Sequence, residues 1–218
     1  MLIAGLDEAG RGPVLGPMAI AIAVLDSETS DYMSGIGVKD SKLLDIGTMR
    51  GLEKEIKEKA AYYKVVVIDN LELDSMMERK SLNEIEAIKA AALISGIPQA
   101  TEKIIVDSPD TNAGEFAKRI AKYCSVPCTL IAEHKADFNY VQVSAASVLA
   151  KTERERQVEL LKKKYGDFGS GYPSDPKTKS YLLEFIQKNK TLPEFARKKW
   201  ATSINAFNDF HQSRLKEW

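Results

Sequence analysis

The chain has 218 residues, 44% of them hydrophobic and 28% charged, and its formal net charge is zero. This composition is typical of a globular protein with one or two domains and a sizeable core, and it excludes a fibrous or disordered chain. No apolar run approaches the roughly 18 residues of a membrane span, and the opening MLIAGLDEAG lacks the basic start of a signal peptide. We therefore expect a cytoplasmic protein that does not bind membranes.

Three segments in the first third of the chain have the composition of β-strands. Residues 2–7 and 18–26 are short apolar runs separated by the Gly- and Pro-rich stretch 9–17, and residues 61–69 are rich in aromatic and β-branched side chains. Short loops or a modest insertion between these strands favour an antiparallel meander.

Helices and strands alternate through the middle of the chain. Residues 81–93 carry one apolar helical stripe, and Ser81 with Glu84 makes a capping box at its start. The further predicted strands are 103–107 and 128–135, and the further predicted helices are 113–123 and 139–164. This order predicts an α/β fold in which helices pack on a mixed sheet. We place a domain boundary before Pro176, with a first domain over 1–175 and a helical C-terminal extension over 176–218.

Charge is distributed unevenly between these parts. Residues 151–218 hold 15 Lys and Arg against 9 Asp and Glu, whereas residues 1–150 hold 16 against 22. A basic segment beside an acidic one suits a phosphate-binding surface next to a carboxylate cluster. Solvated helix faces produce the same asymmetry, so the charge alone does not decide the function.

Four acidic residues stand at or just after the ends of predicted strands. Asp7 and Glu8 end the first strand, Asp107 ends the fourth, and Asp137 follows the fifth. Ligand sites form at strand ends in open sheets, and neighbouring carboxylates repel one another unless a cation neutralises them. Hard divalent cations such as Mg²⁺ and Mn²⁺ prefer oxygen ligands of this kind.

A carboxylate cluster with two metal ions suits phosphodiester hydrolysis. Two ions about 3.5–4 Å apart can activate an attacking water and stabilise the leaving oxygen. The chain offers no Ser/His/Asp arrangement, P-loop or dinucleotide-binding glycine pattern as an alternative. Each acid could instead serve locally, since residues 7–10 could form a turn and Asp137 could cap the following helix. The spacing alone leaves both interpretations open.

Eight blocks of the chain resemble ribonuclease HII, the type 2 ribonucleases H. They occur in the family's order and cover most of residues 2–200: LDEAGRGPVLGP (6–17), VKDSKLL (38–44), SLNEIEA (81–87), VDSPD (106–110), EHKAD (133–137), SAASVLAK (144–151), GSGYPSDP (169–176) and RKKW (197–200). The resemblance implies a ribonuclease H-like fold, in which helices flank a central mixed five-stranded sheet and a helical extension follows.

The same resemblance implies a role for the four acids. Asp7, Glu8, Asp107 and Asp137 match the family's catalytic carboxylates, which bind Mg²⁺ or Mn²⁺. The implied reaction is endonucleolytic hydrolysis of the RNA strand of RNA–DNA hybrids, leaving 5′-phosphate and 3′-hydroxyl ends. It includes incision at single ribonucleotides embedded in duplex DNA.

Two further motifs imply recognition of the ribose. Gly10, Arg11 and Gly12 match the family motif whose backbone contacts the 2′-hydroxyl, and Tyr172 matches the tyrosine that recognises the RNA-to-DNA junction. Glycine lets a backbone approach a ligand closely, and the 2′-hydroxyl distinguishes RNA from DNA. Without the resemblance, the glycines would be an ordinary turn and Tyr172 a partly buried aromatic residue.

Other matched positions imply phosphate contacts. Lys42, Ser147 and Lys151 lie in blocks that contact substrate phosphates in the family, and the basic residues 197–199 could extend that surface. Solvated charges and helix caps are the alternatives at each position.

The chain also departs from family patterns. Leu43 stands where a second lysine is common, which weakens the local positive charge, and Ile204 stands where a sliding-clamp-binding peptide would have glutamine. We therefore do not expect clamp binding, and we expect a monomer because no oligomerisation helix is recognisable.

Three other functions compete with a type 2 ribonuclease H. A DNA nuclease of the same fold would share the carboxylates but lack the Gly10–Gly12 loop and Tyr172. A catalytically silent nucleic-acid-binding module would have lost a carboxylate, and all four are present. A structural or protein-interaction domain would have no reason to bring these acids to strand ends.

Overall fold

A mixed sheet organises the fold. The computed structural model of the chain describes residues 1–39, 44–126 and 128–215, and within these residues five strands pair in the order β3-β2-β1-β4-β5. Strand β1 is antiparallel to β2, whereas β4 runs parallel to both β1 and β5. The strands are β1 Leu2–Ala9, β2 Met18–Leu25, β3 Tyr62–Ile68, β4 Thr101–Asp107 and β5 Thr129–Glu133. The predicted mixed five-stranded sheet is confirmed.

Side-chain caps begin several of the helices. Ser81 Oγ accepts a hydrogen bond from the Glu84 N–H, which confirms the predicted start of the helix there, and Asp175 caps the helix that begins with Pro176. The helices are α1 Ser27–Gly35, α2 Ile46–Lys59, α3 Asn70–Met76, α4 Leu82–Ile94, α5 Ala113–Ala121, α6 Ala136–Asn139, α7 Val141–Tyr165, α8 Pro176–Asn189 and α9 Ala201–Leu215.

The connection between β2 and β3 is longer than the predicted meander suggests. It holds α1 and α2, and α3 follows β3. Helix α1 buries only Met33, so its sequence carries no apolar stripe that would reveal a helix. Helix α2 does bury Leu52 and Ile56 one turn apart, and Asp45 caps its start, so its sequence contained a usable signal.

The chain forms two compact units. The first, called the sheet unit, comprises residues 1–9, 19–67 and 80–154, and the second, called the helical unit, comprises residues 10–18, 68–79 and 155–218. Each unit is assembled from three separate segments, whereas the predicted boundary before Pro176 cuts the chain once. That boundary stays a prediction. None of the described helices is long and apolar enough to cross a membrane.

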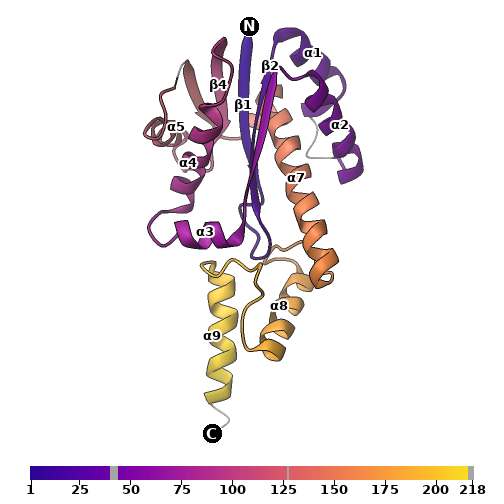
Figure 1. Cartoon of the computed structure of the whole chain (residues 1–218), viewed down its shortest axis with the longest axis vertical. Helices are drawn as coiled ribbons and strands as arrows, with labels where there is room; N and C mark the ends of the chain where they lie inside the picture. The colour runs from indigo at the N-terminus through magenta and orange to yellow at the C-terminus, as the bar shows by residue number, and fades with distance from the viewer. Residues whose placement is uncertain (40–43, 127, 216–218) are drawn as a thin grey trace. The chain divides into compact units, whose positions relative to one another are not determined.

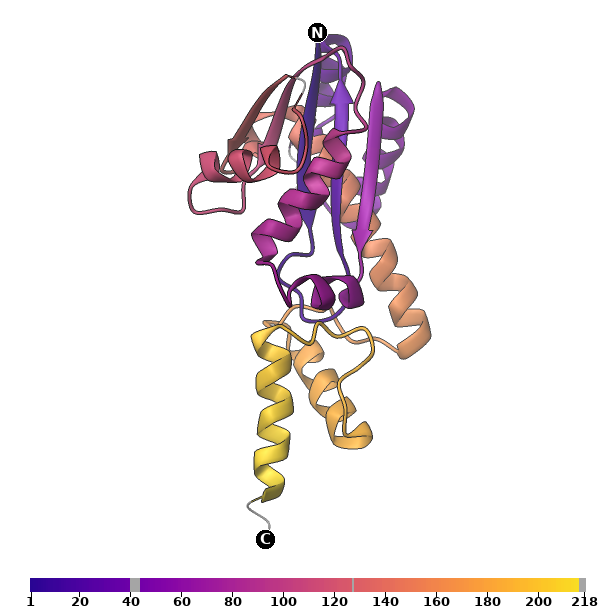
Figure 2. The same cartoon turned by 60° about the vertical axis from the view of Figure 1, so that its left-hand side comes forward.

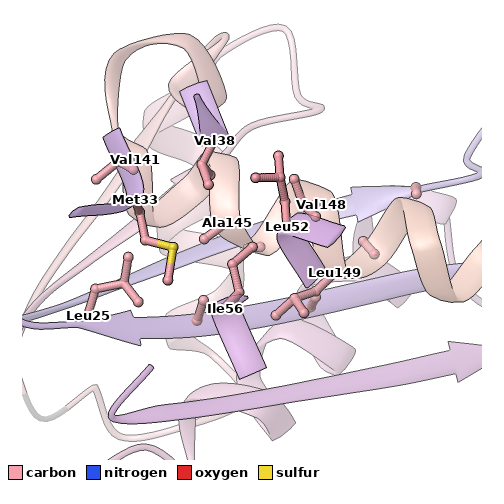
Figure 3. Packing of buried hydrophobic residues seen from close by; sticks show 14 of the residues in the cluster. Leu25, Met33, Val38, Leu52, Ile56, Val141, Ala145, Val148 and Leu149 are labelled. Atoms are coloured by element: carbon pink, nitrogen blue, oxygen red, sulfur yellow. The ribbon is translucent and has the colours of Figure 1, made fainter. Parts of the chain in front are cut away.

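One core of the sheet unit lies between the sheet and one layer of helices. Strand β2 is buried along its whole length, and α1, α2 and the beginning of α7 pack against it through apolar side chains such as Met33, Ile56 and Leu149 (Figure 3). Helices α4 and α5 lie on the opposite side of the sheet (Figures 1 and 2). Gly5 permits a close approach of β1 to α7, because a Cβ there would lie 2.1 Å from the carbonyl carbon of Gln142.

The helical unit has its own aromatic core. The ring centroids of Tyr165 and Phe195 lie 4.7 Å apart, and those of Phe168 and Phe195 lie 4.9 Å apart. Leu15 forms an isolated antiparallel bridge with Ala196. The segment after β1 therefore lies beside residues that come more than 180 positions later in the chain.

Candidate functional site

Asp7, Asp107 and Asp137 come together in the sheet unit. Leu6 of β1 pairs with Val106 of β4 in parallel register, so Asp7, two residues before the end of β1, lies beside Asp107, the last residue of β4. Asp107 accepts a hydrogen bond of 2.7 Å from the Ala136 N–H, which ties the end of β4 to the start of α6. Asp137 follows in the first turn of α6 and is 5% exposed.

The local alternatives to a metal site do not describe the fold around these acids. Asp7 and Glu8 belong to β1, so they do not form a turn. Lys135, in a left-handed conformation, occupies the cap position of α6, and Asp137 is not its cap. Asp7 therefore does not lie in a turn and Asp137 is not the cap of α6, whereas Asp107 does accept a hydrogen bond from the first N–H of that helix.

The electrostatics of Asp7 favour a nearby cation. Burial is the main reason that its pKa is raised to about 7, the nearby Ser147 side chain opposes this rise, and the negative charge of Asp107 adds to it. Asp137 raises the pKa further, and the Glu8 N–H, 2.8 Å from Asp7 Oδ1, lowers it. A carboxyl group with this pKa is fully ionised at neutral pH only when a cation stabilises its charged form.

Glu8 is placed differently from the other three acids. Along β1, Asp7 lies opposite Ala21 and Glu8 lies opposite Ile20. Successive side chains of a strand point to opposite faces, so Glu8 leaves the strand on the other face from Asp7. Its predicted role as a metal ligand stays a prediction.

The three carboxylates are chemically suited to a hard divalent cation, although their side chains do not converge on a common point. Three carboxylates supply oxygen ligands of the type that Mg²⁺ and Mn²⁺ prefer. In the described part of the chain, no three His, Cys, Asp or Glu side chains converge closely enough to hold a metal ion as they stand. A bound cation would relieve the mutual repulsion of these carboxylates.

The predicted phosphate contacts have separate locations. Ser147 lies on α7 and is fully buried, and its hydroxyl lowers the pKa of Asp7 although no described residue lies within hydrogen-bonding geometry of it. Lys151 follows one turn later on α7 and is half-buried. Lys42 lies outside the described residues. All three phosphate contacts stay predictions.

The Gly10–Gly12 loop and Tyr172 come together in the helical unit. Gly10 has a φ of 80°, a conformation that strains residues with a side chain. Gly12 is exposed, and a Cβ on it would lie 3.4 Å from Cε1 of the Tyr172 ring. Tyr172 is 37% exposed, so part of the ring remains open to a ligand.

Backbone hydrogen bonds join the segment before Tyr172 to the residues that follow this loop. The Gly171 carbonyl accepts from the Val14 N–H at 2.8 Å and from the Leu15 N–H at 3.2 Å. The Gly171 N–H in turn donates to Thr178 Oγ1 at 2.9 Å, on the first turn of α8. These hydrogen bonds hold the segment before Tyr172 against both the residues after the loop and the start of α8.

Arg197 corrects the expectation of a basic surface over residues 197–199. Its side chain is fully buried, whereas Lys198 and Lys199 are exposed. The guanidinium lies 4.7 Å from the centre of the Trp200 ring and donates hydrogen bonds to backbone carbonyls of the segment after β1. Sequence reasoning assigned this residue to a phosphate-binding surface because it stands in a run of charges. No local signal reveals its burial, because the carbonyls that it contacts lie far away in the chain.

Comparisons with known proteins agree over nearly the whole chain. The family described as Ribonuclease HII matches residues 4–203. Ribonuclease HII of Pyrococcus horikoshii is 41% identical over 215 residues, which cover 99% of this chain and 97% of that protein.

Solved structures extend the likeness to three dimensions. The crystal structure of the ribonuclease H2 from Pyrococcus horikoshii has a TM-score of 0.90 and 42% identity, covering 97% of this chain and 100% of that one. The structure of the PCNA:RNase HII complex from Archaeoglobus fulgidus gives a TM-score of 0.84 and 39% identity, covering 94% of this chain and 96% of that one.

Proposed function

The chain belongs to the ribonuclease HII family of metal-dependent endonucleases, which act on the RNA of RNA–DNA hybrids, and we propose that it also incises at single ribonucleotides embedded in duplex DNA. The observation that carries this proposal is the packing of Tyr172 on Gly12 in the helical unit. A glycine backbone beside a partly exposed ring suits a single ribose, because the backbone can contact the 2′-hydroxyl while the ring packs on the sugar.

The carboxylates of the sheet unit are proposed to carry the hydrolysis. Asp7, Asp107 and Asp137, together with Glu8, would hold Mg²⁺ or Mn²⁺, which supplies Lewis-acid stabilisation and an activated water. Asp7 is the carboxylate whose charge is coupled to both Asp107 and Asp137. We propose that these carboxylates would hold two ions, which would supply the chemistry of a two-metal mechanism leaving 5′-phosphate and 3′-hydroxyl ends.

Partners other than nucleic acid are not part of the proposal. The Archaeoglobus fulgidus ribonuclease HII forms a complex with PCNA. In this chain Ile204 stands where a clamp-binding peptide would have glutamine, so the absence of sliding-clamp binding stays a prediction, as does the monomeric state.

A cleavage assay tests the proposed function. The protein is incubated with Mg²⁺ or Mn²⁺ and a labelled DNA duplex that carries one ribonucleotide, beside an all-DNA duplex and an RNA–DNA hybrid. We expect cleavage on the 5′ side of the ribonucleotide, no cleavage of the all-DNA duplex, and no cleavage of any substrate in EDTA. Cleavage of the hybrid alone would contradict the proposed incision at single ribonucleotides, and cleavage of the all-DNA duplex would favour a DNA nuclease.

The number of ions is tested by the dependence of rate on metal concentration. If two ions act, the single-turnover rate below saturation should rise with a slope approaching two on logarithmic axes. A slope of one over the whole range would contradict the two-metal part of the proposal and leave the substrate assignment intact.

A further inference from the structure

We propose that Arg197 is a positioning residue for ribose recognition, which sets the direction of the backbone amides in the Gly10–Gly12 loop. The inference rests on the proposed function of that loop. It concerns a buried side chain that arrives from the far end of the sequence and belongs to the same compact unit as the loop.

The guanidinium of Arg197 organises three carbonyl groups at once. Nε donates to the Gly16 carbonyl at 2.9 Å, Nη1 to the Arg11 carbonyl at 3.0 Å, and Nη2 to the Gly10 carbonyl at 2.6 Å. The Arg197 N–H also donates to the Val14 carbonyl at 2.9 Å. One residue thus contacts the first two carbonyls of the loop and two carbonyls of the segment that follows it, and its charge strengthens each hydrogen bond of the side chain.

These contacts fix which way the loop amides face. In a planar trans peptide, the C=O and the following N–H point in opposite directions. Because the carbonyls of Gly10 and Arg11 point toward the guanidinium, the N–H groups of Arg11 and Gly12 point away from it. Gly12 is exposed, and no described residue accepts a backbone hydrogen bond from its N–H. That amide is therefore aimed outward as a donor beside the Tyr172 ring.

The loop would not hold this arrangement by local preference. Gly10 sits at a φ of 80°, and glycine has many other conformations of similar energy. A planar group with several fixed donors can select one of them, whereas the single ammonium of lysine cannot reach three carbonyls in the same geometry. Trp200 stacks on the guanidinium and restricts its rotation.

The inference predicts a loss of ribose recognition rather than a loss of duplex binding. We compare Arg197→Met and Arg197→Lys with Ile186→Ala, a substitution in the buried apolar core of the same unit whose side chain has no hydrogen-bonding group. Two quantities are measured: kcat/KM on a duplex with one ribonucleotide, and the Ki of an all-DNA duplex as competitor. Melting temperatures establish that each variant is folded at the assay temperature.

We expect kcat/KM to fall about 10- to 100-fold in Arg197→Met, the range that one or two lost hydrogen bonds would produce. The Ki of the all-DNA duplex should change less than about threefold. Arg197→Lys should restore little of the lost kcat/KM, because a positive charge without the planar set of donors does not orient the carbonyls. Ile186→Ala should lower the melting temperature and leave both kinetic quantities close to those of the unsubstituted protein.

Three results would overturn the inference. The first is an unchanged kcat/KM in a folded Arg197→Met, the second is a proportional weakening of all-DNA binding, and the third is full recovery with lysine. Failure of the proposed function itself looks different, because the unsubstituted protein would then cut or bind ribonucleotide-containing and all-DNA duplexes alike.

Discussion

The carboxylates at the end of β1 and the Gly10–Gly12 loop are neighbours in sequence, yet their polar groups are compensated in different ways. Burial is the main reason that the pKa of Asp7 is raised to about 7, and the negative charges of Asp107 and Asp137 add to the rise. The loop carbonyls instead receive hydrogen bonds from the buried cation of Arg197. A bound cation would stabilise the charged form of these carboxylates, whereas the loop carbonyls receive their hydrogen bonds from within the protein. Removing metal should therefore affect the two regions differently.

The largest expected effect comes from Asp7→Asn. We expect kcat on a ribonucleotide-containing duplex to fall by about 10³-fold or more, because the carboxylate coupled to two others is lost. Asp209→Asn, an exposed residue on α9, is the matched control and should retain full activity. Residual activity within tenfold of the unsubstituted protein would place the chemistry elsewhere.

The next effect concerns stability without metal. The pKa of Asp7 is raised from an ordinary 3.8 to about 7 in the folded chain, so its contribution to stability is present below pH 4 and is lost as pH rises through 7. At pH 8 in EDTA, Asp7→Asn should therefore exceed the unsubstituted protein in unfolding free energy by on the order of 1–3 kcal/mol.

Chemical denaturation of both proteins at pH 5 and pH 8 measures this difference. It should shrink at the lower pH, where Asp7 is protonated, and it should shrink again when saturating Mg²⁺ is added at pH 8. If the unfolding free energies of the two proteins depended equally on pH, the ionisation of Asp7 would not destabilise the folded chain.

A smaller effect is expected for the loop. Gly10→Ala places a side chain at a φ of 80°, which costs about 1–2 kcal/mol and should lower kcat/KM on a single-ribonucleotide duplex roughly tenfold. The factor by which Gly10→Ala lowers kcat/KM should be the same at every Mg²⁺ concentration. Gly35→Ala is the control, since a Cβ there meets nothing within 4 Å. A defect that extra Mg²⁺ repairs would contradict the separation of the two regions.

The smallest effect is expected from a surface ion pair near the Tyr172 segment. Lys177 Nζ lies 2.6 Å from Asp167 Oδ2, but both side chains are more than half exposed. Lys177→Ala should change neither the melting temperature by more than about 2 °C nor ribonucleotide cleavage, because exposed ion pairs contribute little. A clear loss of cleavage would show that the segment depends on surface charge as well as on the buried hydrogen bonds.

Sequence reasoning located strand ends better than it located long-range contacts. Apolar runs that end in Asp7 and Asp107 predict parallel strand ends at one edge, and the register of β1 with β4 places the two residues together. Asp137 was grouped with them because it follows the fifth predicted strand, and in the structure it lies in the first turn of α6.

The sequence could not indicate how Arg197 acts. Its neighbours Lys198 and Lys199 are exposed, and burial of one member of a charge run depends on residues 10–16, which lie far away in the chain. Helix α1 was missed for a related reason, since it buries a single residue and its polar sequence is that of a loop. A local sequence pattern predicts only which side chains of that segment are buried. The role of Arg197 and the formation of α1 both depend on contacts with residues far away in the chain.

The central claim is that the carboxylates perform the hydrolysis while the loop reads the ribose. The most direct test is the affinity of Asp7→Asn for a single-ribonucleotide duplex relative to an all-DNA duplex, measured by competition in EDTA beside the unsubstituted protein. We predict that the variant cuts neither duplex when metal is restored and that its ribose preference equals that of the unsubstituted protein. Loss of the preference together with cleavage would contradict the claim, because recognition would then depend on the carboxylates.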